Sequence, residues 1–195
     1  GFKVEVRERA LLASRGVPAS SMEGYLSRAL EVMRDSITKP TDRPSASMGG
    51  LLGGEASKLR ALEESGTGVQ GPLIAAATRN AVAVLETNAS MGLIVAAPTA
   101  GSSGVIPAVL FSLQEVQGFS DEQLVGALKN AAAVGELITR NATVSGAEGG
   151  CQAEIGSAAA MAASAAVELL GGSPRMCFSA AASALSNMLG LVCDP

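Results

Sequence analysis

Two cysteines in different surroundings are the residues of this sequence best able to do chemistry. Cys151 stands in a stretch of glycines and small polar residues, Asn141 to Gly156, which reads NATVSGAEGGCQAEIG. We predict that a helix begins at or just after Cys151, where the helix dipole lowers a thiol pKa and favours the metal-binding thiolate. Cys193 follows Gly190 in a Cys-Asp-Pro sequence. On chemistry alone, the two thiols are compatible with a shared metal site, although their spacing is not a zinc pattern.

The sequence contains no histidine. This excludes Ser-His-Asp and Cys-His catalysis within the chain, as well as histidine-ligated zinc. Any metal must therefore take cysteine or oxygen ligands. The third cysteine, Cys177, shares the apolar face of a predicted helix with Ala181, Ala184 and Met188, so we expect it in the core.

A second candidate site lies between Pro98 and Val105, where small hydroxyl residues precede a predicted helix. The free N–H groups and the positive dipole end of a helix N-terminus suit a carboxylate or a phosphate. An ordinary turn before a helix explains the same residues equally well. From these residues alone, both interpretations stay open.

Apolar residues at helical spacing predict the elements that must position these sites. Capping boxes start helices at Ser20 and Ser120, and prolines start helices at Pro72, Pro107 and Pro174. We expect a first short helix that ends at Gly16, and Pro40 to close the second helix. The predicted helices after the first cover about 20–37, 55–64, 72–88, 107–116, 120–140 and 151–170, with a last one from 174. The short apolar run 92–97 fits either a strand or a buried helix.

Composition indicates one compact, mainly α-helical domain over residues 1–195, rich in Gly and Ala, with functional loops at helix N-termini. Only 16% of residues are charged and 3% are aromatic, while 23 are glycines. Helices that meet through Ala, Gly and Ser approach closely. The low charge also predicts that a partner subunit or further chain covers part of the surface, although a core of small residues would lower the charged fraction as well.

Several classes of partner are excluded by charge and hydropathy. The net charge of −4 and the absence of a basic run argue against nucleic acid. The longest Ala-rich apolar run, 158–167, is too short for a membrane span. Three widely spaced cysteines and no secretion signal favour a reducing compartment, so we expect a cytoplasmic protein.

Four segments resemble the catalytic alpha region of the iron–sulfur-dependent L-serine dehydratases. They read, in order, PTAGSSGVIPAVL, NATVSGAEGGCQAEIG, VELLGGSP and NMLGLVCDP. The resemblance runs from about Gly50 to the end of the chain. It implies an enzyme without pyridoxal phosphate that uses a [4Fe–4S] cluster, held by three cysteines with one iron left open. It further implies degradation of L-serine to pyruvate and ammonia through β-elimination of water.

Carried over to this sequence, the resemblance makes Cys151 and Cys193 two of the cluster ligands. The third ligand of the family lies beyond Pro195, so we expect a truncated catalytic domain that is without its cluster and inactive. Cys177 is a poor replacement because a core thiol would have to leave its helix face. The resemblance also implies a beta domain or subunit as partner and a homo-oligomer.

The remaining site residues are assigned by chemistry. For the substrate carboxylate we select Thr99, Ser102 and Ser103 with their backbone amides, and for polar contacts near the cluster Asn141 and Ser145. The base that removes the α-proton is not identified by the sequence. The candidates by chemistry are Lys58, Glu148 and Glu154, and each also has a purely structural explanation.

Two other functions fit parts of the sequence. An L-cysteine desulfidase-type lyase would use the same cluster with a thiol leaving group. A non-catalytic helical module for protein association would fit the low charge with all three thiols buried, but it leaves the loop sequences unexplained. A dinucleotide-binding fold is weaker still, because no G-x-G-x-x-G motif follows a convincing strand.

Overall fold

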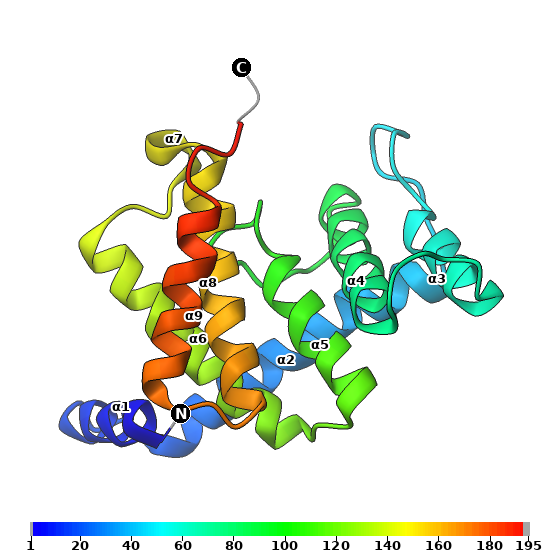
Figure 1. Cartoon of the computed structure of the whole chain (residues 1–195). Coiled ribbons are helices and arrows are strands. Elements are labelled where there is room, and N and C mark those ends of the chain that lie inside the picture. The colour runs from blue at the N-terminus through cyan, green and yellow to red at the C-terminus, as the bar shows by residue number, and fades with distance from the viewer. Residues whose placement is uncertain (1, 193–195) are drawn as a thin grey trace. The chain divides into compact units, whose positions relative to one another are not determined.

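The computed structural model describes residues 2–192, and these residues form α-helices joined by loops (Figure 1). No strand occurs within that range, so the predicted mainly α-helical fold is confirmed. The run 92–97 is irregular rather than strand or helix. Within the described residues, no helix is both long and apolar enough to cross a membrane. The helices are α1 (Phe2–Ser14), α2 (Ala19–Asp42), α3 (Glu55–Ser65), α4 (Pro72–Ala89), α5 (Val105–Gln117), α6 (Asp121–Asn141), α7 (Gly146–Gly149), α8 (Cys151–Leu169) and α9 (Pro174–Asn187).

The described chain divides into two compact units. One contains residues 2–30 and 119–192, and the other contains residues 31–118. Residues 19–30 of helix α2 belong to the first of these units, and residues 31–42 belong to the second. The expectation of a single catalytic domain stays a prediction, since compact units can belong to one domain.

Small residues bring α6, α8 and α9 close together in the first unit (Figure 1). A Cβ atom on Gly135 of α6 would fall 2.9 Å from the sulfur of Met161 on α8. A Cβ on Gly156 of α8 would fall 3.2 Å from a methyl carbon of Leu185 on α9. The buried Asn130 on α6 donates through Nδ2 to Ser164 Oγ on α8 over 2.9 Å. The predicted close packing through small residues is therefore confirmed in this unit.

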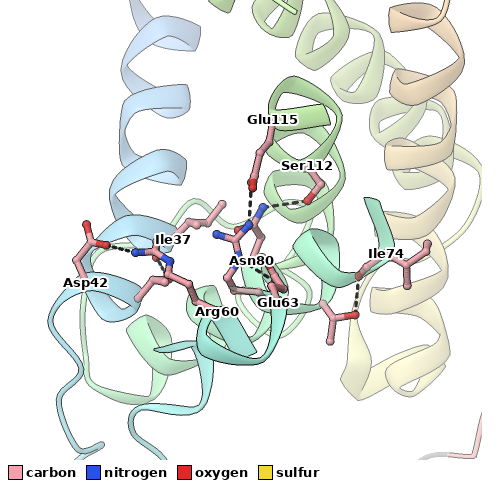
Figure 2. A network of polar contacts seen from close by, with 11 residues as sticks. Ile37, Asp42, Arg60, Glu63, Ile74, Asn80, Ser112 and Glu115 are labelled. Atoms are coloured by element: carbon pink, nitrogen blue, oxygen red, sulfur yellow. Dashed lines mark hydrogen bonds and ion pairs between the residues drawn. The ribbon is translucent and has the colours of Figure 1, made fainter. Parts of the chain in front are cut away.

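In the second unit, α4 packs against both α3 and α5 and carries polar residues on its buried face. The buried Asn80 donates through Nδ2 to Ser112 Oγ on α5 over 2.9 Å. The guanidinium of Arg79 pairs with Glu63 of α3 at 3.2 Å and with Glu115 of α5 at 2.8 Å. Figure 2 shows these polar contacts gathered between the three helices. Helix α4 is therefore the central element of this unit.

Most predicted helix boundaries are confirmed by cap geometry. Ser120 and Gln123 form the complete capping box at the start of α6. The hydroxyl of Ser173 accepts from the backbone N–H of Met176 at the start of α9. Pro72 occupies the first turn of α4. Each of these signals acts over fewer than five residues, which is why sequence alone reveals it.

Three boundary predictions are wrong. Helix α2 begins at Ala19, so Ser20 lies inside the first turn rather than at the cap. The same helix continues through Pro40 to Asp42 instead of ending before the proline. Helix α5 begins at Val105, two residues ahead of Pro107, which the first turn tolerates because its N–H groups have no helical acceptor.

Candidate functional site

Cys151 is the first residue of α8, as predicted, and its side chain is exposed. Gly150, which precedes it, has a φ of 72°. This left-handed backbone suits glycine and turns the chain from α7 into α8. Glu154 follows Cys151 by three residues in the same first turn, so both side chains lie on one face of α8.

The short helix α7 lies tightly against the first turn of α8. A Cβ atom on Gly146 would fall 2.8 Å from a carboxylate oxygen of Glu154. A Cβ on Gly149 would fall 2.8 Å from the Cβ of Ala153. Glycine at both positions is what allows α7 to approach α8. The segment of residues 141–156, predicted as a loop, therefore contains α7 and the first turns of α8, with α7 packed against the first turn of α8.

The last described segment of the chain is bound to the same turn of α8. The backbone N–H of Gly190 donates to Gln152 Oε1 over 2.9 Å. Figure 1 shows this segment at the α7 end of α8. Gln152 is the neighbour of Cys151, and Gly190 precedes Cys193 by three residues, while Cys193 itself lies outside the described residues. Sequence reasoning missed this contact because it joins residues 38 positions apart.

The two polar residues predicted beside Cys151 are placed in the same unit. Asn141 ends α6 and donates through Nδ2 to the carbonyl of Leu137 over 2.7 Å. Ser145 directly precedes α7, where its side chain makes no hydrogen bond to the first turn, and its backbone N–H donates to Thr143 Oγ1 over 3.0 Å. Glu148 is exposed in α7. The side chain of Asn141 therefore makes a hydrogen bond within α6, whereas Ser145 is the residue before the first turn of α7.

The second predicted site is a folded loop in the unit of residues 31–118. Ser102 and Ser103 are buried, with 1% and 3% of their surfaces exposed. Ser102 Oγ lies 3.2 Å from Thr99 Oγ1, and Ser103 Oγ donates to the carbonyl of Ala100 over 2.7 Å. The serine hydroxyls thus hold the shape of the loop. Thr99 is the half-buried member of the three.

Two residues at the end of α4, Asn88 and Glu86, support this unit and were missed by sequence reasoning. Asn88 donates through Nδ2 to the carbonyl of Ala100 in the loop, over 3.3 Å. Glu86 is buried, and its Oε1 accepts from the backbone N–H of Ala56 in the first turn of α3 over 2.9 Å. Its second oxygen, Oε2, is buried without a hydrogen-bond partner. The available signal was the position of Glu86, three residues after the buried Ala83 and so on the same side of α4.

Lys58 lies in α3, where its side chain is 77% exposed and its Nζ is 3.9 Å from Glu55 Oε1. Glu55 accepts from the backbone N–H of Gly53 over 2.6 Å, and this bond is the main cause that lowers the pKa of its carboxyl. Lys58 and the loop of Thr99 belong to one unit, while Cys151 and Glu154 belong to the other. Each group is positioned by the helices of its own unit.

The buried position of Cys177 in α9 confirms the prediction that it is a core residue. Burial raises the pKa of its thiol, and the nearby Glu168 raises it further. A neutral buried thiol is a poor metal ligand, because the thiolate is the form that binds. Among residues 2–192, no three His, Cys, Asp or Glu side chains lie close enough to hold a metal ion together. Of the described thiols, therefore, Cys151 has the exposure and the helix position that suit a ligand.

Residues 4–195 match the model of the serine dehydratase alpha chain family. The chain is 49% identical over 166 residues to a probable L-serine dehydratase alpha chain of Bacillus subtilis. The matched residues make up 85% of this chain and 55% of that protein. It is 43% identical over 170 residues to the L-serine dehydratase alpha chain of Peptoniphilus asaccharolyticus, or 87% of this chain and 58% of that one.

A longer relative is the L-serine dehydratase of Streptomyces coelicolor, which is 49% identical over 119 residues. That match covers 60% of this chain and 26% of the relative. The chain thus spans about half the length of the curated alpha chains it matches, and a smaller part of the longer enzyme.

Proposed function

Because this chain belongs to the serine dehydratase alpha chain family, we propose that it carries the iron–sulfur centre of an L-serine dehydratase. The enzyme would convert L-serine to pyruvate and ammonia. Elimination of water gives aminoacrylate, which tautomerises to an imine, and hydrolysis of the imine returns one water and releases ammonia. The names of the relatives support the substrate and the reaction.

The structural observation that carries the proposal is the bond between Gly190 and Gln152. It ties the segment that leads to Cys193 to the turn of α8 that presents Cys151. We propose these two cysteines as ligands of a [4Fe–4S] cluster, with the third ligand after Pro195 as the family resemblance implies. Cysteine thiolates are the usual ligands of such clusters. When bound, the cluster would supply an open iron that acts as a Lewis acid toward the β-hydroxyl of serine.

The residues around Cys151 have proposed roles in binding and in exchanging protons. Glu154 shares a helix face with Cys151, and its carboxylate lies next to Gly146, so it is one candidate to take the α-proton. Glu148 in α7 is the second candidate, and Lys58 in the unit of residues 31–118 is the third; the side chains of both are exposed. Asn141 and Ser145 would provide polar contacts near the cluster bound by Cys151.

The loop before α5 is proposed to bind the substrate carboxylate. Its backbone N–H groups and Thr99 would make the contact, since anions bind well at helix N-termini. Ser102 and Ser103 would act by holding the loop in shape, because their hydroxyls already bond to atoms of that loop. A beta domain or beta chain and a second copy of the enzyme are the proposed partners. The alpha chain names of the relatives support the first of these.

The test is anaerobic cluster reconstitution in a chain extended beyond Pro195, with iron, acid-labile sulfide and pyruvate formation from L-serine as readouts. We expect about four iron atoms in the unaltered protein. Cys151→Ser and Cys193→Ser should lose the cluster and the activity, whereas the matched control Cys177→Ser should keep both. Full iron content in Cys151→Ser would rule out the proposed ligand set.

A further inference from the structure

Glu86 is a buried carboxylate without a positively charged partner. It lies on α4 with 2% of its surface exposed. Its Oε1 accepts from the backbone N–H of Ala56 over 2.9 Å, whereas its Oε2 is buried and has no hydrogen-bond partner. Glu86 takes part in no ion pair among the described residues. Burial of a carboxylate is costly unless a cation or several donors compensate its charge.

A second carboxylate, that of Glu55, lies at the same end of α3. Glu55 is the first residue of this helix and directly precedes Ala56, to which Glu86 is bonded. Its Oε2 accepts from the backbone N–H of Gly53 over 2.6 Å. That bond is the main cause that lowers the pKa of Glu55, and the side chain of Glu86 contributes to the same shift. Glu55 is therefore ionised at neutral pH, and the two carboxyl groups lie within interaction distance of one another.

The positive charge around this pair of glutamates is weak. Lys58 Nζ is 3.9 Å from Glu55 Oε1, and the lysine side chain is 77% exposed. An exposed ion pair contributes little because water and salt screen it. The N-terminus of α3 adds a positive charge of about one half. Neither of them places a full positive charge at the buried oxygen of Glu86.

We propose that the carboxylates of Glu55 and Glu86 bind a divalent cation of the Mg²⁺ type at the start of α3. Carboxylate oxygens are the ligands that Mg²⁺, Mn²⁺ and Ca²⁺ prefer. Among residues 2–192, no third acidic, histidine or cysteine side chain joins the pair. Mg²⁺ and Mn²⁺ keep several waters and use one or two carboxylates, whereas Ca²⁺ takes about six to eight oxygen ligands, so the smaller ions fit better. Glu55 is half-buried, which leaves its open side to those waters.

The cation would neutralise the buried Glu86 and link the end of α4 to the start of α3. A proton shared by the two carboxyl groups is the other way to relieve their repulsion, and the experiment separates the two. The inference does not depend on the reaction proposed above, because both glutamates belong to the unit of residues 31–118 and Cys151 belongs to the other.

The test titrates the metal-depleted chain with Mn²⁺ and measures the free ion by electron paramagnetic resonance. We expect one bound Mn²⁺ that Mg²⁺ displaces, with paramagnetic broadening of the backbone amide NMR signals of Gly53, Glu55 and Ala56. The Tm followed by circular dichroism should be higher in MgCl2 than in NaCl of equal ionic strength, because the cation binds the folded state.

Two variants and a matched control make the test specific. Glu86→Gln and Glu55→Gln should each weaken Mn²⁺ binding by about tenfold or more, since each removes one charged ligand. Glu86→Gln should also lose the rise in Tm with MgCl2. Glu64→Gln, at an exposed residue near the other end of α3, should keep the affinity of the unaltered chain. Circular dichroism confirms that each variant is folded.

An unchanged Mn²⁺ affinity in folded Glu86→Gln would overturn the proposal. So would the absence of broadening at the start of α3, which would leave a shared proton as the explanation of the pair. Equal Tm values of the unaltered chain in MgCl2 and in NaCl would also reject the site.

Discussion

The hydroxyl of Thr87 on α4 donates to the backbone carbonyl of Ser36 on α2 over 2.7 Å. Ser36 stands four residues before Pro40, whose nitrogen carries no hydrogen, so this carbonyl lacks its usual helical donor. The threonine supplies that donor from another helix. Helix α2 can therefore continue to Asp42 with a proline inside it.

Replacement of Thr87 by valine should destabilise the unit of residues 31–118. The variant keeps the shape of the side chain but leaves a buried carbonyl without a donor, which costs about 1–3 kcal/mol. Urea unfolding followed by circular dichroism measures the loss. Thr78→Val is the matched control, because Thr78 only bonds back to Ile74 within its own helix, and it should change stability by less than about 0.5 kcal/mol. Equal effects of the two variants would contradict the role given to Thr87.

Replacement of Glu86 by glutamine should be tolerated, whereas replacement by alanine should not. Glutamine keeps the oxygen that accepts from Ala56 N–H and replaces the buried, unpartnered carboxylate oxygen with an uncharged amide NH2 group. We expect Glu86→Gln to retain or raise the free energy of unfolding. Glu86→Ala removes the acceptor for the start of α3 and should cost about 1–2 kcal/mol. The comparison is made by chemical denaturation at pH 7, and a glutamine variant as unstable as the alanine variant would show that the negative charge is needed.

Two glycine substitutions should differ because of what a new Cβ would meet. At Gly146 it would meet the flexible carboxylate of Glu154, so Gly146→Ala should move that carboxylate at a cost below about 1 kcal/mol. At Gly172 it would meet the backbone carbonyl of Val167 at 2.8 Å, so Gly172→Ala should cost about 1–3 kcal/mol. Thermal melting measures both effects. A larger loss at Gly146 would mean that Glu154 is held rigidly.

The thiol of Cys177 should make stability depend on pH above neutrality. Burial and Glu168 raise its pKa in the folded protein, so the folded state holds this proton more tightly than the unfolded chain. The stabilising contribution is complete below the unfolded thiol pKa of about 8.5 and decreases as pH rises above it. The urea midpoint should therefore fall between pH 7.5 and 9.5 by more in the unaltered protein than in Cys177→Ala. Equal decreases would contradict the assigned shift.

The sequence predicted the helices well where the signal was local. The capping box of Ser120 and Gln123, the start of α4 at Pro72 and the start of α8 at Cys151 all depend on neighbours within one turn. The same locality explains the error at Pro40, since the donor that replaces its missing N–H comes from residue 87. A one-dimensional pattern cannot show that a distant side chain will satisfy a carbonyl.

For the candidate site, the sequence by itself determined the family, through four segments with their cysteines and glycines, and the helical setting of Cys151. Tertiary structure alone decided three further matters. The first is the hydrogen bond from Gly190 to Gln152. The second is that the hydroxyls of Ser102 and Ser103 bond to carbonyls of the loop before α5, and the third is that the buried Glu86 accepts from the start of α3. The physical reason is that residue type fixes which atoms can donate, accept or carry charge. Which of those atoms meet depends on packing between helices that are far apart in the chain.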